Sequence, residues 1–87
     1  MREREIEKKA CEFAAKNGWY QRKYKTANRR GLPDRIFIRR GIVMFIEFKA
    51  TGEEATEQQK LEHDRIRKQG IEVYVIDNIE DAKVLLF

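Results

Sequence analysis

Asp34, Glu47 and Lys49 are the residues whose types and spacing could carry out chemistry. They fall within the stretch "GLPDRIFIRRGIVMFIEFKA", in which a second apolar run ends on Glu47 and Lys49. Alternate residues of a strand share a face, so these two side chains are expected to point the same way. If the two apolar runs form a hairpin, Asp34 comes level with Glu47 or Phe48. The sequence therefore predicts two carboxylates and one ammonium at the open end of a hairpin.

Such a site needs positive charge. Two carboxylates brought together without a countercharge repel each other and lose hydration. Lys49 supplies one charge, and a hard divalent ion bound by oxygen ligands would supply the rest. An ion held by Asp34 and Glu47 can activate water and stabilise charge on a phosphodiester oxygen, while Lys49 orients the water or neutralises the transition state. The pattern points to phosphodiester hydrolysis with Mg²⁺ or Mn²⁺ as cofactor.

Each part of this pattern also has an ordinary structural explanation. Pro33 followed by Asp34 is common turn chemistry, and a glutamate two residues before a lysine often forms a surface ion pair on a strand. The functional interpretation depends on their combination in one hairpin, after a basic loop and within an otherwise apolar strand.

Basic residues are concentrated just before and within this hairpin. Between positions 20 and 40 the chain has eight Lys or Arg residues and one acid, whereas the whole chain has a net charge of +4. This concentration favours a polyanionic partner, nucleic acid being the commonest, although a solvated positive surface gives the same pattern. The candidate DNA contacts are Lys25, Arg29, Arg30 and Arg35.

Length and composition restrict the class of protein. A chain of 87 residues makes a single domain, 1–87, with one small core. Hydrophobic residues at 41% and charged residues at 39% are typical of a soluble globular protein. No apolar run is long enough to cross a bilayer, so no membrane partner is expected. Cys11 is the only cysteine, which argues against disulfide scaffolds and cysteine-rich zinc sites and favours a cytoplasmic location.

Periodicity and turn signals predict a mixed α/β fold in the order α-β-β-β-α-β-α, a small sheet flanked by helices. The strand at 42–49 is apolar at nearly every position, which is typical of a central strand covered on both faces. Thr56 and Gln59 form a capping box at the start of the second long helix, and the strand after that helix should run parallel to a strand of the same sheet. The predicted ranges are helices 2–16, 56–70 and 79–87, and strands 19–25, 34–39, 42–49 and 71–76.

The proline–aspartate pair, the short hairpin and the Glu-x-Lys that follows resemble the signature of the PD-(D/E)xK nuclease superfamily. The fuller set, "GLPDR", "FIEFKA", "TEQQ" and "GIEVYVI", is similar to its virus-type replication-repair nuclease (VRR-NUC) branch, and the resemblance covers almost the whole chain. It implies a restriction-endonuclease-like core and metal-dependent hydrolysis of DNA. Free-standing domains of this size resemble junction-resolving enzymes, which implies a homodimer acting on branched DNA such as four-way junctions.

The resemblance also implies roles for individual residues. Asp34 and Glu47 would bind the metal, with the backbone carbonyl of Phe48 as a third ligand, and Lys49 would be the catalytic lysine. The family's glutamine matches Gln59, with Gln58 as the alternative.

The family's glutamate on the first helix matches Glu7, which lies well inside that helix. Glu3 is the second choice, because it lies in a first turn that is expected to fray. Acids in the first turn of a helix also offset its dipole, which explains Glu3 better than Glu7.

Other chemically notable residues are expected to have roles other than metal binding. His63 lies on a charged helix and is expected as a surface residue or as a neighbour of the site rather than as a metal ligand. Trp19, Tyr20 and Tyr24 could stack on unpaired bases, although core packing is the simpler role in so small a protein.

Two alternatives compete with a structure-selective endonuclease. One is a non-catalytic nucleic-acid-binding module that keeps the nuclease fold, and the other is a restriction-type nuclease specific for a sequence. The latter would need extra elements to read base edges in the major groove, for which the chain has little room. The apolar C-terminus "VLLF" leaves surface to cover and favours a symmetric dimer.

Overall fold

The computed structural model describes residues 1–23 and 31–87. The elements follow the predicted order and include a four-stranded sheet arranged β1-β2-β3-β4. The predicted mixed α/β fold is confirmed. The elements are α1 Glu3–Lys16, β1 Tyr20–Lys23, β2 Arg35–Arg39, β3 Ile42–Phe48, α2 Glu57–Arg67, β4 Glu72–Ile76 and α3 Ile79–Leu86.

The sheet is mixed. β1 pairs antiparallel with β2 and β2 with β3, whereas β4, which follows α2, runs parallel to β3 as predicted. The hairpin between β2 and β3 turns at Arg40 and Gly41, whose φ angles of 51° and 82° are those of a two-residue type I′ turn. This turn fixes the register so that Arg35 faces Ile46. Asp34 therefore comes level with Glu47, one of the two predicted positions.

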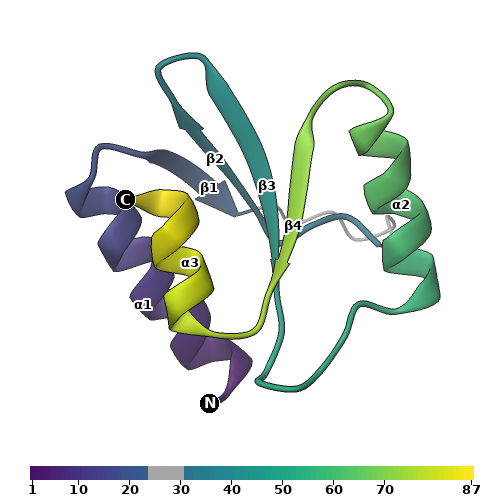
Figure 1. Cartoon of the computed structure of the whole chain (residues 1–87), viewed down its shortest axis with the longest axis horizontal. Helices are drawn as coiled ribbons and strands as arrows, with labels where there is room; N and C mark the ends of the chain where they lie inside the picture. The colour runs from purple at the N-terminus through teal and green to yellow at the C-terminus, as the bar shows by residue number, and fades with distance from the viewer. Residues whose placement is uncertain (24–30) are drawn as a thin grey trace.

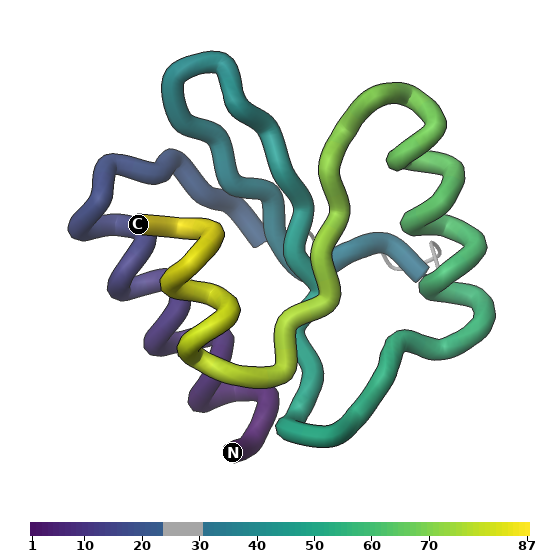
Figure 2. The backbone as a smooth tube through the Cα atoms, viewed as in Figure 1, coloured from purple at the N-terminus to yellow at the C-terminus, as the bar shows by residue number. Residues whose placement is uncertain are grey.

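Helices cover both faces of the sheet (Figure 1). α1 and α3 lie side by side on one face, and α2 lies on the other, next to β4. The backbone trace shows the start of α1 close to the loop that leaves β3 (Figure 2). Because β3 lies between β2 and β4, it is the central strand that its apolar sequence predicts.

The face covered by α1 and α3 is apolar. α1 contributes Ile6, Ala10 and Ala14, whose spacing places them on one side of the helix. They belong to the same buried cluster as Phe37 and Phe48, whose rings meet edge to face with 6.5 Å between centroids. Burying one such ring contributes about 1.5–3 kcal/mol, so this layer is a main source of stability.

Trp19 belongs to this core, which agrees with the expectation of core packing rather than base stacking. Its indole Nε1 donates a hydrogen bond to the carbonyl oxygen of Leu86 at 3.0 Å, and the guanidinium of Arg39 lies 4.4 Å from its ring centroid. Tyr20 is exposed instead, with Arg22 packed 4.3 Å from its ring centroid. Trp19, the residue before β1, therefore links the start of that strand to the end of α3.

Sequence-based expectations also concern Cys11 and the first strand. Cys11 is a free, half-buried thiol packed against the core, and burial raises its pKa. The predicted strand at 19–25 is present as Tyr20–Lys23, while Tyr24 and Lys25 lie outside the described residues. Within residues 1–23 and 31–87, no helix combines the length and apolar character needed to cross a membrane.

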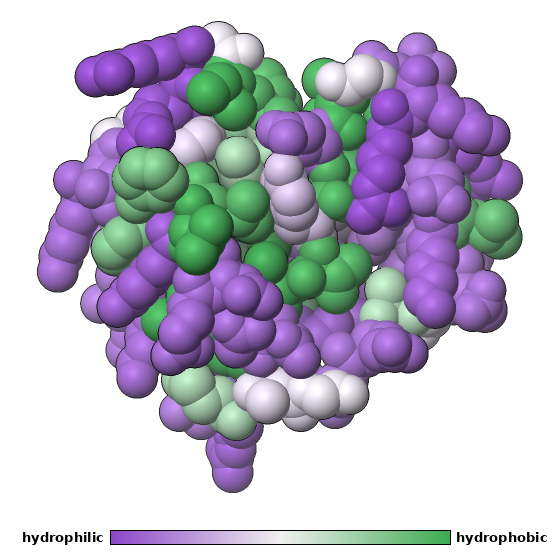
Figure 3. Space-filling view, viewed as in Figure 1, coloured by the Kyte–Doolittle hydropathy of each residue, from purple (hydrophilic) through white to green (hydrophobic). Residues whose placement is uncertain are grey.

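α2 begins and ends as the sequence predicts. Thr56 accepts a hydrogen bond from the backbone N–H of Gln59 at 3.1 Å, and the side chain of Gln59 accepts one from the N–H of Thr56 at 2.9 Å. Gly70, with φ of 87°, follows its last turn. Few side chains of α2 are apolar, and its outer surface is mainly hydrophilic (Figure 3).

Candidate active site

Asp34, Glu47 and Lys49 come together where β2 begins and β3 ends. The backbone N–H of Phe48 donates a hydrogen bond to Oδ2 of Asp34 at 2.8 Å. Nζ of Lys49 lies 4.0 Å from Oε2 of Glu47. The constellation predicted from the hairpin is thus present in the folded chain.

The alternation of side chains along β3 explains this arrangement. Ile46 and Phe48 point into the apolar core, so Glu47 and Lys49 point to the opposite face, which α2 covers. The backbone N–H of Lys49 donates to the carbonyl oxygen of Ile76 at 2.9 Å, which continues the pairing of β3 with β4 beyond the strand's last residue. Lys49 is therefore held by the sheet.

Gly31 brings the chain before β2 close to α2. Its φ is 86°, and a Cβ atom there would lie 2.8 Å from the carbonyl oxygen of Gln58, so a larger residue would force the two segments apart. Pro33 is fully buried two residues later. These contacts place Asp34 between the end of β3 and the first turns of α2.

Glu47 is buried, with 3% of its surface exposed. Burial first, and the charge of Asp34 second, raise the pKa of Glu47 from 4.5 to about 8, while Lys49 acts in the opposite direction. Without a further positive charge, the two neighbouring carboxyl groups therefore retain a proton near pH 7.

His63 is a residue that sequence reasoning placed only loosely. Of its two expected placements, the surface is wrong, because His63 is 1% exposed, and a place beside the site agrees with the structure, since Nε2 lies 3.9 Å from Oε1 of Glu47. Burial, followed by the charge of Arg67, lowers its pKa, which keeps the imidazole neutral. The available signal was the helix face that His63 shares with Gln59 and Ile66.

The structure separates the two candidate acids of α1. Oε2 of Glu7 receives a hydrogen bond from Nε of Arg35 at 2.6 Å and lies 3.4 Å from Nζ of Lys23. Burial raises the pKa of Glu3, and the neighbouring charges that act on it most strongly are those of Asp34, which raises it, and Lys49, which lowers it. Glu3 thus lies within electrostatic reach of the predicted centre, whereas Glu7 forms ion pairs on the other face of the sheet.

The first turn of α1 is anchored. The backbone N–H of Thr51 donates to the carbonyl oxygen of Met1 at 3.1 Å, and the N-terminal amine lies 3.1 Å from the hydroxyl oxygen of Thr51. The expected fraying of this turn is therefore wrong, and with it the reason for ranking Glu3 second. This anchor joins the start of α1 to the loop after β3.

The two glutamines lie at the start of α2. The carbonyl oxygen of the Gln59 side chain is taken by the capping box, which leaves its amide nitrogen for any further contact. Gln58 is exposed. Gln59 forms the capping box that the sequence predicts, and its catalytic role stays a prediction.

Most of the predicted DNA contacts lie between β1 and β2 in the sequence. Lys25, Arg29 and Arg30 lie outside the described residues. Arg35 is partly buried and engaged with Glu7, and its Nη1 also lies 3.4 Å from the side-chain oxygen of Gln21. Arg35 thus helps to join β2 to α1, and its contact with DNA stays a prediction.

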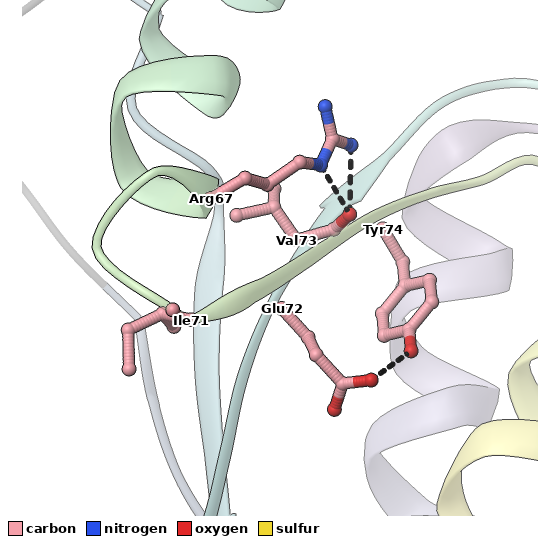
Figure 4. A pocket seen from close by; sticks show the side chains of 6 residues that line it. Arg67, Ile71, Glu72, Val73 and Tyr74 are labelled. Atoms are coloured by element: carbon pink, nitrogen blue, oxygen red, sulfur yellow. Dashed lines mark hydrogen bonds between the residues drawn. The ribbon is translucent and has the colours of Figure 1, made fainter.

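Over the described residues, no three His, Cys, Asp or Glu side chains form a cluster that could hold a metal ion, and this includes the end of β3, where the candidate ligands are two carboxylates, Asp34 and Glu47. A hollow between α2 and β4 is lined by structural contacts (Figure 4): Nε and Nη2 of Arg67 donate to the carbonyl oxygen of Val73 at 3.2 and 2.7 Å, and the Tyr74 hydroxyl donates to Glu72 at 2.6 Å. The cluster at the end of β3 is the leading candidate because it brings the buried Glu47 together with Asp34 and Lys49.

A mixed sheet with helices on both faces and an Asp…Glu-x-Lys cluster at the end of the central hairpin defines the class of PD-(D/E)xK nuclease-like domains. The VRR-NUC domain family matches residues 3–78, so the chain belongs to the VRR-NUC domain family.

Two similar proteins agree with this membership. A solved structure titled "VRR_NUC domain" superposes with a TM-score of 0.85 at 30% identity, covering 95% of this chain and 91% of that one. A protein of Acyrthosiphon pisum secondary endosymbiont phage 1, named "Putative nuclease p44", is 36% identical over 86 residues, which are 98% of this chain and 92% of that protein. The predicted family and restriction-endonuclease-like core are thereby confirmed.

Proposed function

We propose that this protein is a metal-dependent DNA endonuclease whose reaction takes place at Asp34, Glu47 and Lys49. The observation that carries the proposal is the buried Glu47, which faces Lys49 and comes level with Asp34 at the end of an otherwise apolar strand. A buried carboxylate destabilises a fold unless it is well paired. A purely structural role therefore explains this cluster poorly.

The donor set suits a hard divalent cation such as Mg²⁺ or Mn²⁺. Glu47 and Asp34 offer carboxylate oxygens, and the raised pKa of Glu47, about 8, reflects a site that lacks positive charge. The N–H of Phe48 points to Asp34, and because the N–H and C=O of a strand residue face the same neighbour, its carbonyl would offer a third oxygen. When bound there, the cation would act as a Lewis acid on the scissile phosphate.

The side chains around these ligands would complete the chemistry. The Lys49 ammonium would hold the attacking water or stabilise negative charge on the phosphate while the bond to the leaving oxygen breaks. The amide nitrogen of Gln59 would donate a hydrogen bond to the same phosphate. Of the two acids on α1, Glu3 fits the site better than Glu7, since Glu3 senses the charges of Asp34 and Lys49.

Phosphate contacts outside this centre would come from the basic residues that precede β2 in the sequence. Lys25, Arg29 and Arg30 come shortly before Asp34 along the chain, so their positive charge would favour binding of DNA whose scissile phosphate lies at the site. The charge on these residues would also offset the repulsion between DNA and the site's carboxylates.

We further propose a homodimer that acts on branched DNA, such as a four-way junction, in replication, recombination or repair. Apolar side chains gather over α3 in the space-filling view (Figure 3), where Val84 and Phe87 are 69% and 71% exposed. A second copy that covers this patch would remove it from water, and two sites related by a two-fold axis suit paired cuts. Because a relative comes from a phage, the cytoplasm of an infected host cell is the proposed setting.

The test is cleavage of labelled four-way junction, flap, single-stranded and duplex DNA in Mg²⁺, Mn²⁺ or EDTA, by wild type, Asp34→Ala and Lys49→Ala. We expect cutting of a branched substrate that needs the metal and is lost in both variants. Binding without cutting in either metal would refute the catalytic proposal and leave a nucleic-acid-binding module. Cutting of duplex DNA at one sequence would refute structure selectivity, and a monomer in sedimentation would refute the dimer.

A further inference from the structure

His63 and Glu47 form an unusual pair beneath α2. Over the part of the chain that the structure describes, two buried side-chain polar atoms have no hydrogen-bond partner: Nε2 of His63 and Oε1 of Glu47. They face each other at 3.9 Å. An unpaired buried donor or acceptor is unfavourable, and a movement of about 1 Å would bring this pair within hydrogen-bond distance.

The two oxygens of Glu47 have different neighbours. Oε2 lies 4.0 Å from Nζ of Lys49, on the side of the proposed reaction centre. Oε1 lies toward the imidazole. A donor on Oε1 would therefore fix the rotation of the carboxylate and present Oε2 to the centre.

The helix that carries His63 is held at both ends. The Thr56 capping box fixes its start, and one turn after His63 the Arg67 guanidinium donates two hydrogen bonds to the carbonyl oxygen of Val73 on β4. His63 also borders a hollow of about 410 Å³ whose polar lining includes Lys60 and Asp77. The contacts at the two ends of α2 hold the backbone that carries the imidazole beside Glu47.

We propose that His63 is a positioning residue for the nuclease centre, donating a hydrogen bond from Nε2–H to Oε1 of Glu47 and thereby orienting the carboxylate toward the bound cation. The inference rests on the proposed metal-dependent function. Removing a group that hydrogen-bonds to a metal ligand and orients it typically lowers metal affinity or activity by about 10–100-fold. If His63 only filled space, an apolar side chain of similar volume could replace it without loss of metal affinity.

The test is calorimetric titration of Mn²⁺ into wild type, His63→Leu and His63→Gln. His63→Leu keeps the volume without a donor, whereas His63→Gln restores an N–H. We expect His63→Leu to weaken Mn²⁺ binding by about 10–100-fold and His63→Gln to stay within about threefold of wild type. Thermal melts of the three proteins check that the variants fold.

The outcomes separate this inference from the proposed function. Wild type that binds no Mn²⁺ overturns the metal-dependent function, and the inference with it. Equal affinity of wild type and His63→Leu overturns the role of His63 alone, as does equal weakening in His63→Leu and His63→Gln.

If His63→Leu does not fold, wild type still decides the question. In ¹⁵N NMR of the Mg²⁺-saturated protein, we expect the imidazole proton on Nε2. A proton on Nδ1 with Nε2 bare would overturn the inference.

Discussion

The two faces of the sheet differ in what they bury. The face under α1 and α3 buries aromatic and aliphatic side chains, among them Phe37 and Phe48. The face under α2 buries Glu47 and His63, both with an unpaired polar atom, and His63 is the buried residue of that helix. One strand, β3, serves both faces because its side chains alternate.

This difference suggests a division of labour. The apolar face supplies burial that stabilises the fold, whereas the polar face keeps groups whose desolvation works against stability. A small domain can keep such groups only if the other face holds the sheet together. Substitutions on each face should show whether stability and chemistry separate in this way.

The largest expected effect is on the apolar face. Phe37→Ala should lower the free energy of unfolding by about 3–5 kcal/mol, because the ring is fully buried and packed against Phe48. Urea unfolding followed by circular dichroism measures this, with Leu61→Ala on the exposed surface of α2 as control. A loss below about 1 kcal/mol in Phe37→Ala would show that stability is not concentrated on this face.

The two acids of α1 should separate activity from stability. Glu3→Gln is expected to slow DNA cleavage by about 10–100-fold with little change in unfolding, because Glu3 senses the charges of Asp34 and Lys49. Glu7→Gln should leave cleavage nearly unchanged and lower stability, since it weakens a partly buried pair with Arg35.

Glu5→Gln, an exposed position on the same helix, is the matched control for both acids. Single-turnover cleavage and urea unfolding of the three variants measure the two effects. If Glu7→Gln abolishes cleavage while Glu3→Gln does not, the assignment of the α1 acid is reversed.

The metal-free protein should lose stability as pH rises. The pKa of Glu47 is raised to about 8 in the folded state, so between the ordinary value near 4.5 and pH 8 the folded protein binds a proton more tightly than the unfolded chain does. This contribution is fully present at lower pH and disappears above pH 8. In EDTA, the unfolding free energy of wild type relative to Glu47→Gln should fall by at least about 1 kcal/mol from pH 5 to pH 9. Parallel pH curves for the two proteins would contradict the shift.

The smallest expected effect concerns the rim of the apolar face. Arg39→Ala should lower the free energy of unfolding by about 1 kcal/mol. The Arg39 guanidinium packs on Trp19, and its Nη1 donates a hydrogen bond to the carbonyl oxygen of Asn17 at 2.8 Å. Cleavage should not change. Urea unfolding of wild type and Arg39→Ala measures the loss. Arg40→Ala is not a suitable control, because Arg40 has a positive φ in the hairpin turn.

Much of the fold and part of the site follow from local patterns. The type I′ turn at Arg40 and Gly41 fixes the hairpin register, and the register brings Asp34 level with Glu47. The Thr56 capping box fixes the start of α2. These features depend on a few adjacent residues, so the sequence predicts them.

The remainder depends on contacts between distant segments. The bonds between Met1 and Thr51 hold the start of α1, which no property of the helix itself indicates. The burial of His63 was only partly indicated, by the helix face that it shares with Gln59 and Ile66, because α2 has few apolar residues to mark its inner face. The pairing of Arg35 with Glu7 was not predicted, because it joins residues that are 28 positions apart in the sequence.

The most direct test compares cleavage by wild type and Glu47→Gln, with Glu80→Gln as an exposed acid-to-amide control. Glu47→Gln keeps the shape of the buried side chain and removes its charge. With Mg²⁺ and a branched DNA, we expect its single-turnover rate to fall by at least about 100-fold, while DNA binding in EDTA and the rate of Glu80→Gln stay unchanged. A rate for Glu47→Gln within a few-fold of wild type would contradict the assignment of the nuclease centre to the buried end of β3.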